Sequence, residues 1–174
     1  MRATFMLVVL MLFAPLAGAL EVSGVVFPDS AALSPEGPQL VLNGAGERKI
    51  LVFRIYAIGL YLPVRAKSLG DALALKGPKR IHMVMLRDGI TSKQVHDHVI
   101  AQIEDGTQPA EMAVLKEKID ELTRIIEAEH VINLGGTIFL DYVPGTGTVI
   151  RVNGAPKGEP IPGEEFFNSL LRIW

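Results

Sequence analysis

Five polar side chains in this sequence have the chemistry needed to hold a small acidic group: Arg48, Arg54, Tyr56, Thr91 and His98. A guanidinium pairs with a carboxylate through two parallel hydrogen bonds, and phenol, hydroxyl and imidazole groups add single hydrogen bonds. On an unbroken strand, Arg48, Arg54 and Tyr56 face the same side, because successive side chains alternate. The same face carries Ile50, Val52, Ile58 and Leu60. This composition indicates a mostly apolar pocket with a few polar groups; the alternative is that both arginines lie at a sheet edge in water.

The stretch NGAGERKILVFRIYAIGLYL, residues 43–62, could also be taken for a nucleotide loop or a membrane span. A dinucleotide fingerprint needs glycines between a strand and a helix, whereas Gly44 and Gly46 lead into a β-branched and aromatic run. No Gly-Lys-Ser or Gly-Lys-Thr follows, so a P-loop is excluded as well. Arg48, Lys49 and Arg54 interrupt the apolar run and exclude a span. We therefore expect a turn at residues 43–46, followed by one long strand or a bent pair of strands over residues 48–62.

Thr91 and His98 fall on a predicted helix from about residue 91 to about Asp105, ended by Gly106. Thr91 and Gln94 form a capping box, which gives Thr91 a structural role as an alternative to ligand binding. His98 lies seven residues after Thr91, on nearly the same side of the helix, and borders an apolar stripe. It is placed either at the edge of a cleft or on the surface.

No metal site is predicted. His96 and His98 are two residues apart and point about 200° from each other on a helix. His82 and His130 have no evident ligand set, and the chain has no cysteine. Asp141 lies in a strand candidate and has no evident catalytic partner, so it is interpreted as a solvated or cleft-rim carboxylate. There is no G-x-S-x-G motif to suggest a hydrolase triad.

The first residues predict export. Residues 1–19 place Arg2 before an apolar run and end in Ala17-Gly18-Ala19, which is typical of a signal peptide cut after about Ala19. An uncleaved anchor is the alternative, but the run is short of the roughly 20 residues of a span. Without Arg2, 16 basic residues remain against 19 acidic ones, a formal charge of −3 that gives no basis for nucleic-acid binding. These features fit a periplasmic or secreted protein with no stable membrane span after cleavage.

Residues 20–174 are expected to form one domain. Strand candidates come first, two helices lie in the middle, a hairpin around Pro144–Gly147 follows, and a helix closes the chain. The second of the middle helices is expected over about residues 110–128, with an apolar stripe. Phe53 and Tyr61 are interpreted as core aromatics. This order predicts an α+β domain, an antiparallel sheet with helices gathered on one face.

The run Asn43-Gly44-Ala45-Gly46, then Arg48, then Tyr56-Ala57-Ile58-Gly59-Leu60-Tyr61-Leu62 resembles the signature of the chalcone isomerase-like family, in particular its exported bacterial branch. The resemblance covers roughly residues 22–174. It implies an open-faced β-sandwich with a ligand cleft between sheet and helices, and no metal or organic cofactor. Plant members close a chalcone into a flavanone, while a sister group binds fatty acids through the arginine and a tyrosine.

The resemblance transfers unevenly to individual residues. Arg48 matches the family's arginine, but Tyr56 falls where the enzymes have a catalytic threonine. Thr91 falls at the catalytic tyrosine, and His98 at a cleft asparagine. These departures argue against chalcone isomerase chemistry.

We therefore expect a non-catalytic binder of a small apolar molecule with a carboxylate, such as a fatty acid. Arg48 and Tyr56 would hold the acidic end, with Arg54, Thr91 and His98 as further candidates. The first alternative is an isomerase or intramolecular lyase acting on a chalcone-like enone, with a phenolate held by the same two residues. The second is a scaffold protein whose cleft is vestigial.

Overall fold

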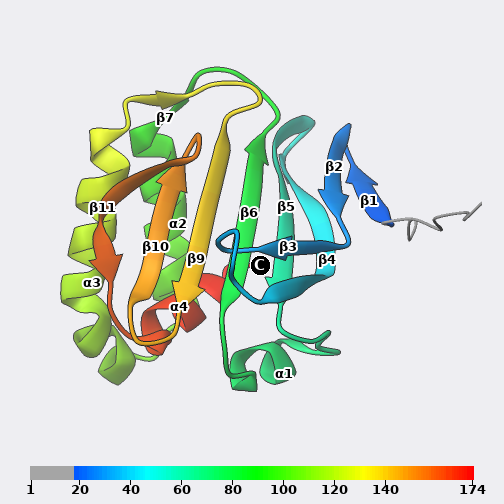
Figure 1. Ribbon diagram of the computed structural model, residues 1–174. Helices are drawn as coiled ribbons and strands as arrows, with labels where there is room; N and C mark the ends of the chain where they lie inside the picture. Colours follow the sequence, from blue (N-terminus) through cyan, green and yellow to red (C-terminus); the bar gives the residue numbers. More distant parts are fainter. Residues whose placement is uncertain (1–17) are drawn as a thin grey trace, which may run out of the picture.

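The computed structural model describes residues 18–174, so the expected signal peptide lies almost entirely outside the described residues. Its main feature is a curled antiparallel sheet of seven strands in the order β11-β10-β9-β6-β5-β4-β3 (Figure 1). The strands, in chain order, are β3 (Ser30–Ala32), β4 (Gln39–Ile50), β5 (Phe53–Leu62), β6 (Lys79–Met85), β9 (Thr137–Val143), β10 (Gly147–Val152) and β11 (Ala155–Ile161).

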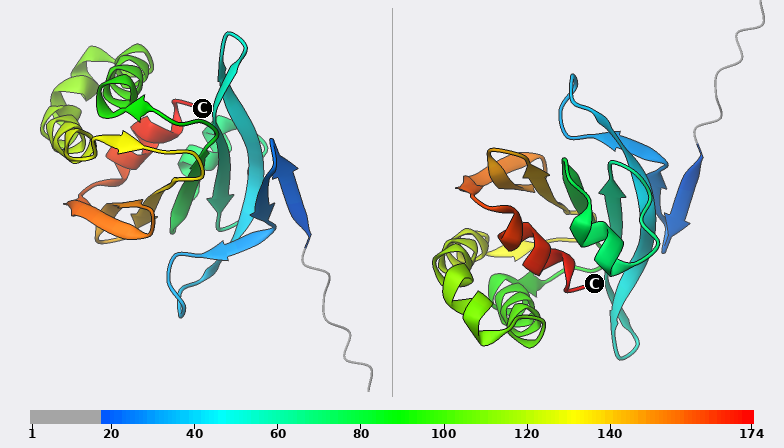
Figure 2. Two further views of the ribbon diagram at one scale, coloured as in Figure 1. Left: turned by 90° about the horizontal axis from the view of Figure 1, so that it is seen from above. Right: turned by 90° about the horizontal axis from the view of Figure 1, so that it is seen from below.

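The helices α2 (Ser92–Asp105), α3 (Pro109–Ala128) and α4 (Glu164–Leu171) all lie on the concave face of this sheet (Figure 2). The main hydrophobic core fills the space between them and the sheet. A short α1 (Leu69–Ala74) follows β5, and the two-residue strands β7 (Ile90–Thr91) and β8 (Val131–Ile132) pair at the ends of α2 and α3. This arrangement confirms the predicted α+β class and the open-faced β-sandwich.

Among the described residues, the hairpin of β1 (Ala19–Val22) and β2 (Val25–Pro28) covers one end of the opposite face, and the segment around β3 also packs there. A second, smaller core forms there around Phe27 and Tyr61, so the interpretation of Tyr61 as a core aromatic is confirmed. Gly59 makes the contact with the hairpin possible: a Cβ at this position would lie 2.6 Å from the Phe27 ring. Glycine here permits close approach and marks no bulge, because the register around Gly59 is regular.

The β4–β5 hairpin differs from the expectation at its turn. Residues 43–46 were expected to be a turn but lie inside β4, where a bulge at Asn43 lets the chain continue to Ile50. The turn is formed instead by Leu51 and Val52, with Leu51 in the left-handed region at a φ of 53°. Residues 48–62 therefore form two strands joined by a turn. Of the two expected arrangements, one long strand or a bent pair, the structure has the pair. Phe53, expected in the core, is largely exposed beside this turn.

The predicted positions of the two long helices, α2 and α3, are confirmed. Thr91 caps α2 in the complete capping box with Gln94, and Gly106 follows its last residue. Helix α3 begins at Pro109, and Leu115, Ile119 and Leu122 form its buried stripe. Within residues 18–174, none of the helices is both long and apolar enough to cross a bilayer.

Asp141 has a different role from the one expected. It is fully buried on the face of the sheet opposite the helices. Its carboxylate accepts two hydrogen bonds from Arg80, at 2.6 Å and 2.8 Å, and pairs with Arg151. The sequence could not show this because the three residues come from three different strands, and only the pairing of β6, β9 and β10 brings them together.

Candidate functional site

A cavity of about 490 Å³ lies between the concave face of the sheet and α2 and α3. This volume is within the range of about 300–1,000 Å³ that is usual for small-molecule sites. Its walls are mainly aliphatic and thioether side chains. The sheet supplies Ile55, Met83, Met85, Ile138, Leu140, Ile150 and Val152, and the helices supply Val95, Val99, Leu122, Ile125, Ile126 and Leu170. The interior is suited to a hydrocarbon group.

Arg48 and Tyr56 line this cavity from neighbouring strands. They are direct cross-strand partners, Arg48 on β4 and Tyr56 on β5. The register shifts immediately after Arg48, since Lys49 pairs with Arg54 and leaves Ile55 as the extra residue. The bulge explains why Ile55 and Tyr56, adjacent in sequence, both line the cavity, whereas on a regular strand they would face opposite sides.

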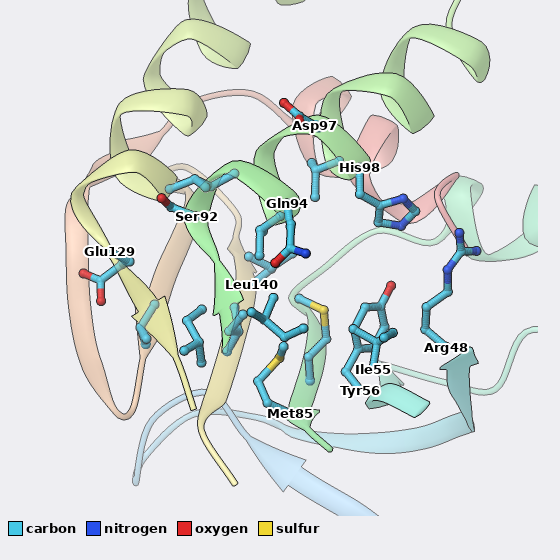
Figure 3. Close-up of a pocket in the computed structure, with 18 of the residues that line it drawn as sticks. Arg48, Ile55, Tyr56, Met85, Ser92, Gln94, Asp97, His98, Glu129 and Leu140 are labelled. Atoms are coloured by element: carbon cyan, nitrogen blue, oxygen red, sulfur yellow. The ribbon is translucent and has the colours of Figure 1, made fainter. Parts of the chain in front are cut away.

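Polar side chains gather at one end of the cavity. Figure 3 shows Arg48 from β4, Tyr56 from β5 and His98 from α2 converging there, with Glu129 at the far end. The Trp174 indole N–H donates a hydrogen bond to the Tyr56 hydroxyl oxygen at 2.7 Å, and the two rings meet edge to face. The Tyr56 O–H therefore remains available as a donor, and the end of the cavity is polar while its body is apolar.

Electrostatics favours a negatively charged group at this end. Burial raises the pKa of Tyr56, although the hydrogen bond from Trp174 and the charge of Arg48 act against that rise, so the phenol stays protonated and can donate. Burial, together with the nearby Arg48 charge, lowers the pKa of His98. At neutral pH the guanidinium is thus accompanied by two neutral groups, the Tyr56 phenol and the His98 imidazole.

Two nitrogens at this end have unmet hydrogen-bonding capacity. Arg48 Nε and His98 Nε2 are both buried and have no partner among the residues that the structure describes. An unpaired buried donor is costly, so such groups are normally satisfied by a partner. A carboxylate, or another anionic oxygen, placed beside Arg48 could accept hydrogen bonds from the guanidinium, the Tyr56 phenol and His98.

A second cavity of about 630 Å³ lies next to the first. It is lined by the Asn43–Arg48 part of β4, by the start of α1 and by the residues that follow α4. Arg48 and Trp174 line both cavities, so these two side chains form the boundary between them. No role at the site was predicted for Trp174. Its role depends on how the chain end folds back onto β5, which no sequence pattern shows.

Arg54 and Thr91 are not among the residues that line the cavity. The Arg54 side chain is 58% exposed and pairs with Glu47 at 3.4 Å. The hairpin turn and the bulge break the alternation that placed Arg54 beside Tyr56 in the sequence analysis. The Thr91 hydroxyl accepts a hydrogen bond from the Gln94 N–H within the capping box. Of the five candidates, the structure brings Arg48, Tyr56 and His98 together.

The described part of the chain contains no cluster of three or more histidine, aspartate or glutamate side chains able to hold a metal ion. The polar groups of the cavity are suited instead to hydrogen bonding and charge pairing with an organic ligand.

Comparison with known proteins agrees with this architecture. The sequence profile described as chalcone isomerase-like matches residues 19–174. The crystal structure of a fatty-acid binding protein of Arabidopsis thaliana superposes with a TM-score of 0.63 at 18% sequence identity, covering 86% of this chain and 82% of that one. Among curated proteins, none matches the sequence significantly. The match over nearly the whole described chain shows that this protein belongs to the chalcone isomerase-like family.

Proposed function

We propose that the protein is a non-catalytic binder of a small apolar molecule with an acidic end, such as a fatty acid. One observation carries the proposal: at the polar end of an apolar cavity, the buried Nε of Arg48 has no partner among the described residues, and Arg48 lines this cavity together with its cross-strand partner Tyr56. The fatty-acid binding protein of similar fold supports the same ligand class.

The ligand would lie with its hydrocarbon chain between the sheet and helices α2 and α3. Its carboxylate would pair with Arg48 and accept hydrogen bonds from Tyr56 and His98. A charge-assisted contact in such a dry site contributes about 1.5–3 kcal/mol. Burial of the alkyl chain contributes about 0.8 kcal/mol for each methylene removed from water. The apolar walls therefore provide most of the affinity, and the polar end provides orientation and selectivity for an acid.

We further propose that the protein works in the periplasm or outside the cell. The support is the composition of residues 1–19, with an early arginine, an apolar run and a small-residue triplet. Expression of the full chain in a bacterial host, with fractionation and N-terminal sequencing, tests this. A periplasmic product that begins near residue 20 is expected, and a cytoplasmic product that retains residue 1 would contradict it.

The binding proposal is tested by extracting the purified protein with organic solvent and identifying the released molecules by mass spectrometry. Long-chain acids in stoichiometric amount are the expected result. If the extract holds none, and titration with saturated fatty acids of increasing length also shows no affinity, the proposal is wrong.

An isomerase acting on a chalcone-like enone is the second candidate. The same end of the cavity favours it, because Arg48 and the protonated Tyr56 could stabilise an oxyanion as charge moves onto a carbonyl oxygen. The test is the change in absorbance of a chalcone panel. Turnover that disappears in an Arg48→Gln variant would support an enzyme, and no turnover across the panel would remove this candidate.

A further inference from the structure

The turn between β4 and β5 exposes four consecutive apolar residues. Leu51 and Val52 are 89% and 85% exposed, and Ile50 and Phe53 on either side are exposed by about half. In both views of Figure 2 this hairpin turn stands clear of the rest of the fold. Single exposed apolar residues are ordinary on a protein surface, but a contiguous apolar projection marks an interaction site.

Positively charged side chains surround this apolar tip. Lys49 and Arg54 flank it in sequence and are exposed, and the Arg87 guanidinium lies 4.9 Å from the aromatic ring of the tip. Glu47 pairs with both Lys49 and Arg54, and Asp88 follows Arg87 in the chain. Three cations against two anions leave the tip positive, whereas the whole chain has a formal charge of −2.

The tip is also continuous with the cavity. Ile50, Phe53 and Arg87 are exposed at the tip or beside it and at the same time line the first cavity. Whatever surface the tip contacts therefore lies next to the wall of this cavity.

We propose that the β4–β5 tip docks on an anionic lipid bilayer, with its apolar residues among the acyl chains and its cations at the lipid phosphates. The order of groups, apolar at the apex and cationic below it, matches the order of layers at a membrane surface. A short apolar insertion and a few cations are each weak membrane signals, and stable association requires both together. Docking goes beyond the binding function and stands whether or not the ligand is a fatty acid.

A site-specific fluorescent probe tests this directly, because the chain has no cysteine. Val52→Cys in the full-length protein is labelled with nitrobenzoxadiazole, a dye whose emission shifts to the blue and brightens on leaving water. Val114→Cys is the matched control. Val114 is exposed as well, at 63%, but it lies on α3, away from the tip. Both are mixed with vesicles of equal parts phosphatidylglycerol and phosphatidylcholine, and with vesicles of phosphatidylcholine alone.

We expect a blue shift and brightening at position 52 with the anionic vesicles, a smaller response with phosphatidylcholine, loss of response at high salt, and little change at position 114. Adding Leu51→Ser to the labelled protein should raise the lipid concentration that gives a half-maximal response roughly fivefold to tenfold. No change at position 52, or the same change at both positions, would overturn the proposal. An equal response to both vesicles would overturn the assignment of anionic lipid. A vesicle-independent shift at position 52 that grows with protein concentration would assign the tip to a second copy of the chain.

Discussion

Arg48 and Tyr56 are cross-strand partners on β4 and β5, and both side chains line one apolar cavity. The pairing fixes their separation through the backbone hydrogen bonds of the sheet. A guanidinium and a phenol held in this way form a preorganised site for one carboxylate. In an exposed pair, the two long side chains would be mobile, and they would lose conformational entropy when the ligand bound.

Replacing Tyr56 by phenylalanine should weaken the binding of a long-chain fatty acid roughly tenfold, because the hydrogen bond from the phenol to the carboxylate is lost. The protein should still fold, since the ring keeps its place in the wall. Trp174 is the only tryptophan in the sequence, and its indole N–H donates a hydrogen bond to the Tyr56 hydroxyl at the proposed binding site. Its fluorescence emission therefore reports binding as fatty acid is titrated into the protein. Tyr61→Phe in the second core is the matched control and should bind like the parent. Equal affinities for both variants would show that Tyr56 does not contact the acid.

Asp141→Asn should lower the free energy of unfolding by about 3 kcal/mol or more, because Arg80 and Arg151 would lose the buried carboxylate charge that compensates them. Asp120→Asn is the control, since that carboxylate forms an exposed pair with Lys116 that contributes at most about 1 kcal/mol. Urea unfolding curves measure both. Similar midpoints for the two variants would contradict the structural role of Asp141.

His82 should make the protein less stable in mild acid. Burial, with the nearby Arg80 charge, lowers the pKa of His82 to about 4, and the ring stacks on Phe139. Between about pH 6.5 and pH 4 the unfolded chain therefore binds a proton that the folded chain does not, and stability is lost as pH falls through this range. Because the ring is partly exposed, we expect a contribution on the order of 2 kcal/mol.

The measurement is the free energy of unfolding of the parent and of His82→Gln at several pH values. The difference between them should change between pH 6.5 and pH 4 and be constant above. His130→Gln, at an exposed position, should follow the parent curve throughout. A His82→Gln curve parallel to that of the parent would show that His82 is not buried in its neutral form.

The sequence predicted elements whose signals are local. The capping box of Thr91 and Gln94 places the start of α2 correctly, because both partners lie within one helical turn. The strand Ala155–Ile161 carries Pro156, Gly158 and Pro160 and was not predicted. It lies at the edge of the sheet, where a proline without an N–H is tolerated.

The site itself was predicted only in part. Residue types pointed to Arg48 and Tyr56, but alternation on one strand also selected Arg54, which the hairpin turn and the bulge direct into solvent. Leu51 and Val52 have none of the residue types that usually mark a turn, so the position of the hairpin could not be predicted. Trp174 and the partners of Asp141 come from distant parts of the chain, and only the tertiary fold brings them into place.

The most direct test of the account is the affinity of the Arg48→Gln variant for a long-chain fatty acid and for its methyl ester, measured by titration calorimetry beside the parent and Lys49→Gln. Lys49 is adjacent in sequence but exposed and paired with Glu47, so its variant controls for the loss of one positive charge. We expect the parent and Lys49→Gln to prefer the acid to the ester. Arg48→Gln should bind the acid roughly tenfold to a hundredfold more weakly, a loss of about 1.5–3 kcal/mol, with little change for the ester. Unchanged affinity for the acid in Arg48→Gln would contradict the central claim that this guanidinium holds the ligand.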